Sequence, residues 1–126
     1  MLSLVLKVCL MDQPCQETRV ASFHTASAWS MCETNRLNMQ RDSDAQNHKG
    51  TFECRVGLTT FKMEPVATLN LNVCANGTEC EDVKVAEFYG KQSGAPLCAK
   101  NADFYRGPLE ESAKATQATI KLDCHS

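Results

Sequence analysis

Acid–base catalysis near neutral pH is the first chemistry to look for, and histidine is the side chain best suited to it. The chain of 126 residues has three histidines: His24, His48 and His125. A ribonuclease-like hydrolase would place a histidine and a carboxylate around a phosphate, with a cation to hold the charge. Such a set could be assembled from His24, Glu53, Arg55 and Glu87. A chain of this length always permits such a selection, and HExxH, GxSxG and GxGxxG motifs are absent. We therefore predict no catalytic residue, with a small secreted ribonuclease-like hydrolase as the alternative.

Cysteine is the residue type that stands out in the composition. The chain has eight: Cys9, Cys15, Cys32, Cys54, Cys74, Cys80, Cys98 and Cys124. None forms a CxxC pair and the spacings do not match zinc sites, so neither a metal nor another cofactor is expected. An even number of dispersed cysteines is typical of disulfide bonds made in an oxidising compartment. The sequence thus favours a secreted, extracellular protein with all cysteines paired over a cytosolic protein with reduced thiols.

Local spacing gives a partial prediction of the disulfide connectivity. The predicted pairs are Cys15–Cys32, Cys74–Cys80, Cys9–Cys124 and Cys54–Cys98. The first two are favoured because each closes a short loop around turn residues, and the last two are what remains. The loop between Cys74 and Cys80 contains Asn76-Gly77-Thr78, a predicted N-glycosylation site at Asn76 in a secreted chain.

Length and charge exclude several other classes of protein. The length of 126 residues fits one domain, residues 1–126, and we see no internal repeat or linker. A net charge of −2 gives no basic field for nucleic acid. No apolar run approaches the ~18 residues that span a bilayer. Met1 to Leu10 lacks the basic leader of a signal peptide, so the sequence is taken as mature protein.

Alternation of apolar and polar residues predicts strands along most of the chain. The predicted strands are Leu2–Leu10, Asn35–Arg41, Thr51–Leu58, Ala67–Val73, Asp82–Tyr89 and Ala118–Cys124. Pro108 suits the first turn of a short helix, and the pattern in Ser22–Met31 fits either a helix or a bent strand. The predicted fold is mainly β, a disulfide-stapled antiparallel sandwich or barrel with one or two short helices. The alternative is a small α+β sandwich with Ser22–Arg41 and Pro108–Gln117 as helices.

Aromatic residues are the candidate binding anchors. Trp29 is expected in the core against a Cys15–Cys32 bridge, with an exposed binding role as the alternative. Tyr89, Phe104 and Tyr105 belong to adjacent aromatic pairs, and in a strand one member of such a pair faces outward. We therefore predict that these three side chains contact a partner, together with the exposed loops Arg41–Gly50 and Lys91–Gly107.

Three short segments together resemble a known protein family. Trp29-Ser30-Met31-Cys32 places a tryptophan three residues before a half-cystine. The segment VATLNLNVC leads into the Cys74–Cys80 loop, and DVKVAEFYGK follows it. They resemble the Alternaria major-allergen family of secreted fungal proteins, in which the last segment instead opens the chain and cysteines are fewer. The resemblance implies a compact β-barrel, often a homodimer, linked to allergenicity, to plant-defence elicitation and to binding of plant defence proteins or small phenolics.

Recognition without turnover is the function that these observations favour. A rigid, cross-linked β scaffold lowers the ordering cost of binding through exposed loops. We predict a secreted, non-enzymatic fungal-type effector or elicitor that binds a host protein, from a plant, in the apoplast. Nucleic acid and membrane are not predicted partners. A secreted hydrolase inhibitor is a further alternative beside the ribonuclease-like hydrolase.

Overall fold

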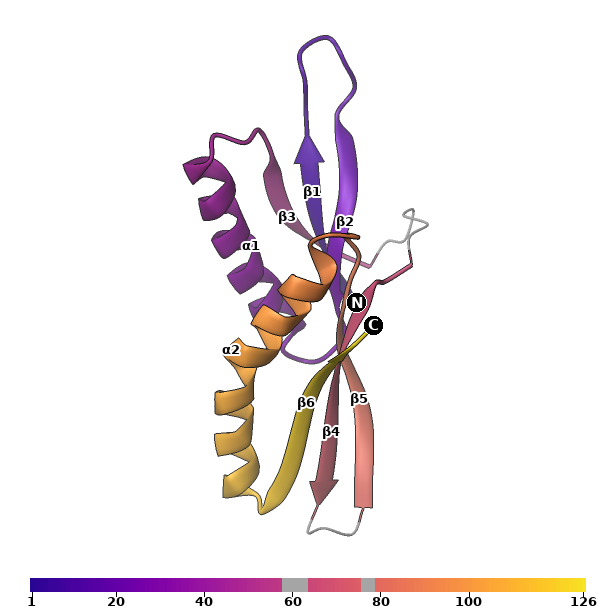
Figure 1. Cartoon of the computed structure of the whole chain (residues 1–126), viewed down its shortest axis with the longest axis vertical. Helices are drawn as coiled ribbons and strands as arrows, with labels where there is room; N and C mark the ends of the chain where they lie inside the picture. The colour runs from indigo at the N-terminus through magenta and orange to yellow at the C-terminus, as the bar shows by residue number, and fades with distance from the viewer. Residues whose placement is uncertain (58–63, 76–78) are drawn as a thin grey trace. The chain divides into compact units, whose positions relative to one another are not determined.

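The computed structural model describes residues 1–57, 64–75 and 79–126 (Figure 1). The chain divides into two compact units, Met1–Glu64 and Pro65–Ser126. Of the described residues, 41% lie in strands and 34% in helices, so β structure predominates. The assignment of residues 1–126 to one domain stays a prediction.

The first unit is a three-stranded antiparallel sheet with one helix. Its elements are β1 (Leu2–Val8), β2 (Gln16–Phe23), α1 (Ala28–Ala45) and β3 (Thr51–Val56). The sheet order is β3-β1-β2, so β1 is central. Leu4 is opposite Cys54 in the register, and a disulfide ties Cys54 to Cys32 of α1. The helix therefore covers the face that carries Leu4, and Leu4 is fully buried beneath it.

The second unit has the same composition of elements. They are β4 (Ala67–Ala75), β5 (Glu79–Phe88), α2 (Gly94–Ala115) and β6 (Ala118–His125). The sheet order is β5-β4-β6, again antiparallel with the first strand of the unit in the centre. Leu69 is opposite Cys124, which is bonded to Cys98 of α2, and Leu69 is fully buried.

The two units are copies of one ββαβ motif. In each, a short disulfide closes the tip of the first hairpin and a longer one joins the helix to the third strand. The hairpin register shifts at equivalent places, between Leu4 and Val5 in the first unit and between Leu69 and Asn70 in the second. A shared irregularity of this kind is a designed feature of a strand rather than a defect. The chain thus contains an internal repeat, contrary to the expectation from sequence.

The repeat is visible in the sequence at only a few positions, which can be recognised once the structure aligns the two units. The tip cysteines are followed by VASF in the first unit and VAEF in the second, each beginning five residues after the second cysteine. The helix then carries a cysteine and, three residues later, an asparagine: Asn35 in α1 and Asn101 in α2. Both asparagines are buried, and each donates its side-chain amide to the carbonyl four residues earlier at 2.8 Å. Few other positions are identical, so period and composition alone did not reveal the duplication.

All eight cysteines are paired, which confirms the prediction of four disulfides. The pairs are Cys9–Cys15, Cys32–Cys54, Cys74–Cys80 and Cys98–Cys124. Cys74–Cys80 was predicted, whereas Cys15–Cys32, Cys9–Cys124 and Cys54–Cys98 were wrong. Strand β2 begins just after Cys15 and runs toward α1, so it separates Cys32 from Cys15. Cys9 instead lies opposite Cys15, across the hairpin that β1 and β2 form.

Both helices are longer than expected from sequence. The predicted strand at Asn35–Arg41 lies inside α1, whose buried residues Met31, Cys32 and Asn35 follow a helical spacing. Lys91–Gly107 was expected to be irregular, yet most of it belongs to α2, with Pro108 in the helix interior rather than in its first turn. Likewise the first part of Arg41–Gly50 is the end of α1. The spacing of two between Leu37 and Met39 was misleading because Leu37 is exposed and packs on no sheet.

The prediction of a mainly β, disulfide-stapled antiparallel fold with helices is confirmed. Within each unit one helix lies on one open three-stranded sheet, which is the arrangement of the α+β alternative. None of the helices within the described residues is long and apolar enough to cross a membrane.

Candidate binding site

The aromatic anchors expected from sequence do not form one exposed patch. Tyr89 is only 5% exposed, so it is part of the interior rather than a contact residue. Phe104 is exposed in α2, and Tyr105 beside it is half-buried, with the two rings 4.9 Å apart in an edge-to-face arrangement. The predicted glycosylation site Asn76 lies outside the described residues.

The residues considered for acid–base chemistry are engaged elsewhere. Arg55 of β3 donates to Glu53 at 2.7 Å and also to Glu17 of β2. These hydrogen bonds raise the pKa of Arg55 and lower that of Glu17, so the guanidinium is already neutralised by two carboxylates. His24 lies 3.5 Å from the Ser22 hydroxyl, and Glu87 belongs to the other unit. Within the described residues, no three His, Cys, Asp or Glu side chains are placed to hold a metal ion.

Trp29, expected in the core, is instead exposed by 57% of its surface. It lies in the first turn of α1, where the helix begins beside the end of the sheet. Val56, the last residue of β3, is exposed by 74%. Two large apolar side chains from different elements thus meet solvent at the same end of the first unit.

A hollow of about 290 Å³ lies between these two side chains. Its floor is one row across the sheet, because the register aligns Val56 with Leu2 and Leu2 with Phe23. Its wall is the segment that leads into α1. The lining residues are Met1, Leu2, Phe23, His24, Thr25, Ala26, Ala28, Trp29 and Val56. None of them is an acidic side chain, a lysine or an arginine, so the hollow suits an uncharged apolar group.

The equivalent place in the second unit is filled. Val66 corresponds to Met1, Gly94 to Ala28, and Tyr89 to His24. A Cβ atom on Gly94 would lie 2.3 Å from a methyl carbon of Val66, so Val66 occupies the space against the helix start. Tyr89 is buried where His24 is exposed. The hollow is therefore a feature of the first unit and not a consequence of the ββαβ motif.

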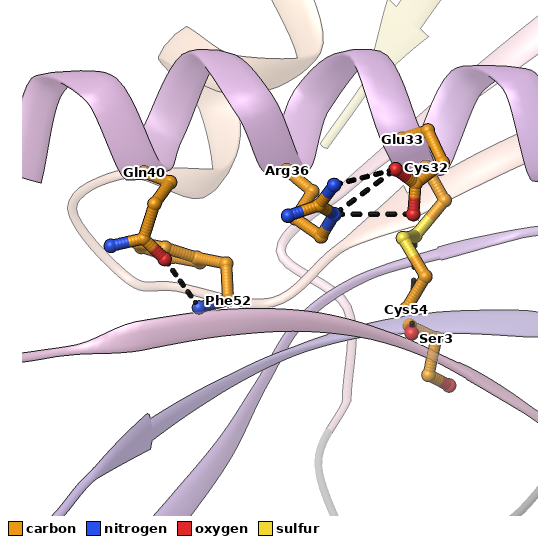
Figure 2. Close-up of polar contacts among 7 residues, drawn as sticks. All are labelled: Ser3, Cys32, Glu33, Arg36, Gln40, Phe52 and Cys54. Atoms are coloured by element: carbon orange, nitrogen blue, oxygen red, sulfur yellow. Dashed lines mark hydrogen bonds and ion pairs between the residues drawn. A yellow bond between two sulfur atoms is a disulfide. The ribbon is translucent and has the colours of Figure 1, made fainter.

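Beside the hollow lies the free edge of the sheet, formed by β3. Gln40 of α1 covers the first part of this edge, as Figure 2 shows: its side-chain oxygen accepts from the Phe52 N–H at 2.9 Å. Its amide nitrogen donates to the Gly50 carbonyl at 3.0 Å. Arg106 holds the equivalent position in α2 and donates to the Leu122 carbonyl of β6 at 3.1 Å. In both units a helix side chain takes the place of a neighbouring strand at this point.

Figure 2 also shows how α1 is fixed over the sheet. The Cys32–Cys54 disulfide joins helix to strand, and Cys32 is fully buried. Arg36 pairs with Glu33 on the same helix at 2.7 Å. Because α1 is attached to the sheet at Cys32 and at Gln40, its first turn, which carries Trp29, is held in a fixed position relative to the sheet.

Comparison of the chain with protein-family models, curated proteins and solved structures gives no match. Membership of the Alternaria major-allergen family therefore stays a prediction. Sequence reasoning missed the hollow, and the signal that could have indicated it was Trp29, the single tryptophan of the chain, whose exposed binding role was only the alternative prediction. Its exposure could not be inferred, because the predicted bridge that would have buried it joins other cysteines.

Proposed function

We propose that this chain is a secreted, non-enzymatic binding protein of the effector type, whose first unit recognises a host protein through the Trp29 hollow. The observation that carries the proposal is an exposed tryptophan over a hollow without acidic, lysine or arginine side chains, on a disulfide-fixed support. Tryptophan is enriched among residues that dominate binding energy. A pre-organised site also binds without the cost of ordering a loop.

The four disulfides support a secreted protein, because such bonds persist in oxidising compartments. Support for binding over turnover comes from the site itself. The lining of the hollow offers His24 as its one ionisable side chain, with no carboxylate or lysine to complete an acid–base pair. An apolar surface of this kind can hold a partner side chain by burial alone.

The test is affinity capture from plant apoplastic fluid with the wild type, Trp29→Ala and Phe104→Ala. Phe104 is a matched control because it is an aromatic residue with 59% exposure, close to the 57% of Trp29. We expect Trp29→Ala to weaken the affinity for the captured partner by about thirtyfold or more, the level of a binding hot spot. Phe104→Ala is expected to stay within about threefold of the wild type.

Fluorescence provides a second readout, because Trp29 is the only tryptophan. Binding at the hollow should shift its emission to shorter wavelength as water is excluded. Equal retention of the partner by wild type and Trp29→Ala would show that the site is wrong. Hydrolysis of RNA or glycan by the purified protein, with no partner captured, would remove the binding proposal altogether.

A further inference from the structure

We propose that the partner binds the first unit as an added β-strand along the open end of β3, with one apolar side chain inserted in the Trp29 hollow. This inference rests on the proposed function for the hollow and specifies how it is used. Addition of a strand to a sheet edge obtains affinity from main-chain hydrogen bonds and selectivity from pockets for alternate side chains.

The register of β3 determines which of its backbone groups face outward. The Gly57 N–H donates to the Met1 carbonyl, so residues 51, 53 and 55 also direct their backbone groups toward β1. The N–H and C=O of Phe52, Cys54 and Val56 must then face away from β1. The bond from the Phe52 N–H to Gln40 agrees with this assignment.

Gln40 protects only the start of this edge. Of its three hydrogen bonds, one stays on the helix at Asp44 and two reach Gly50 and Phe52. The outward groups of Cys54 and Val56 are left without a bond from any residue that the structure describes. An edge strand is a template for another strand unless it is covered. The uncovered part ends at Val56, whose side chain lines the hollow. Backbone groups and an apolar pocket are thus next to each other.

The size and lining of the hollow favour a peptide segment over other occupants. The hollow of about 290 Å³ lies at the lower limit of ligand-pocket volumes, about 300 Å³, and its mostly apolar lining has room for one bulky apolar side chain. A second copy of this chain is a poorer occupant. When two β3 edges pair through their outward backbone N–H and C=O groups, Cys54 of one copy lies opposite Val56 of the other. Because Cys54 is bonded to Cys32 in its own unit, its side chain is not free to enter the hollow beside Val56. An extended segment with an aromatic or branched apolar residue satisfies both features.

Random linear heptapeptides displayed on phage are the probe, selected on the wild-type chain and counter-selected on Trp29→Ala. Enriched peptides are then measured on Val56→Pro and Val56→Ala. Proline removes the outward N–H of Val56 and is tolerated on a sheet edge, while alanine shortens the side chain and keeps the N–H. We expect binding to Val56→Pro to be about tenfold weaker than to Val56→Ala, from the loss of an edge hydrogen bond and its neighbours.

A second arm uses wild-type protein only and so does not depend on the folding of a variant. The enriched peptide is N-methylated at alternate residues, in one version on the odd positions and in the other on the even positions. One version should lose about tenfold or more in affinity and the other should bind like the parent, because only one edge of an added strand meets β3.

Four outcomes would overturn the inference. Equal binding to Val56→Pro and Val56→Ala, or an equal effect of both methylated peptides, would exclude strand addition and leave the hollow as the site. If counter-selection on Trp29→Ala leaves no peptide, because every peptide bound by the wild type also binds the variant, the hollow itself is excluded as the site, and with it the proposed function. A wild-type dimer that Val56→Pro converts to monomer would identify the occupant as a second copy of the chain.

Discussion

Arg55 shows how single residues join the strands of the first unit. Its guanidinium lies on β3 and contacts Glu17 on β2, so the interaction crosses the central strand β1. Glu53 on β3 holds the same guanidinium at 2.7 Å. All three side chains are about one-third or more exposed, and exposed ion pairs contribute little to stability because water screens them. Their effect is therefore best detected through pH.

Glu17→Gln should make the stability of the protein less sensitive to acid. The pKa of Glu17 is lowered in the folded state from 4.5 by its hydrogen bond to Arg55. Between the folded and unfolded pKa values of Glu17, the unfolded state binds more protons than the folded state. The contribution of the Glu17–Arg55 interaction to the free energy of unfolding is therefore complete above about pH 4.5, and it is lost as the pH falls through the folded pKa. Thermal unfolding from pH 7 to pH 2.5 measures it, with Glu81→Gln on β5 as control. Parallel curves for wild type and Glu17→Gln would contradict the prediction.

Helix α2 is bent, and its two glycines have different surroundings. Helix α2 contains Gly107 and Pro108 in its interior, and Figure 1 shows that it changes direction along its length. Proline removes one helical hydrogen bond and displaces the preceding turn, which accounts for such a bend. Gly107 has open space around it, whereas Gly94 at the helix start is packed against Val66.

Alanine at these two glycines should have different effects. Gly107→Ala should change the stability by less than about 1 kcal/mol, because the lower freedom of alanine in the unfolded chain is offset by contact of its Cβ with the ring of Pro108, which follows it in the helix. Gly94→Ala should destabilise by about 1–3 kcal/mol, because its methyl group would lie 2.3 Å from Val66. Urea unfolding of both variants distinguishes the two effects. A stabilising effect of Gly94→Ala would show that Val66 does not occupy the space against the start of α2.

Covering of the β3 edge by Gln40 gives a further prediction at the level of elements. Gln40→Ala should cost about 1–3 kcal/mol, mainly from the loss of the bonds to Gly50 and Phe52, and should increase aggregation because the edge is then open along its length. Gln40→Glu should lie between, since it can accept from Phe52 and cannot donate to Gly50 or to Asp44. Chemical denaturation and light scattering are the measurements, and Arg41→Ala, an exposed neighbour, is the control. Equal stability of Gln40→Ala and Arg41→Ala would count against this role.

At the scale of the whole molecule, the repeated ββαβ motif assigns two kinds of disulfide to each half. One kind closes a hairpin tip with a sequence separation of 6 in both units. The other joins helix to third strand with separations of 22 and 26, and each has a fully buried half-cystine, Cys32 or Cys98. The hairpin is already held by its strand ladder, while the helix has few other ties to the sheet.

The helix-to-strand disulfides should therefore matter more than those at the tips. Loop entropy alone gives about 2.4 kcal/mol for Cys9–Cys15 and about 3.4 kcal/mol for Cys32–Cys54. Loss of buried Cys32 adds a packing term to the second value. Denaturation of Cys9→Ala/Cys15→Ala beside Cys32→Ala/Cys54→Ala tests the order, and the equivalent pairs of the second unit should repeat it. A tip variant as unstable as the helix variant would refute this ranking.

The sequence determined those properties that depend on local pattern. Alternating apolar residues identified β1, β3, β4, β5 and β6, since a strand with one buried face imposes a period of two. An even number of cysteines predicted full pairing, and the Asn-Gly turn predicted Cys74–Cys80. These signals need no knowledge of which segments lie next to each other.

Tertiary structure decided everything that depends on neighbours. Helix α1 has only three buried residues, so its polar sequence did not show a face until the sheet supplied one. The pairs Cys9–Cys15 and Cys74–Cys80 have the same spacing in the sequence, but only the register of the two hairpins placed each pair at an equivalent tip. Trp29 is exposed because α1 begins beyond the sheet row of Leu2 and Phe23. Tyr89 is buried, although it belongs to an adjacent aromatic pair of which one member was expected to face outward. Exposure is set by packing between distant segments, and the hydrophobicity of a residue does not specify which segments will cover it.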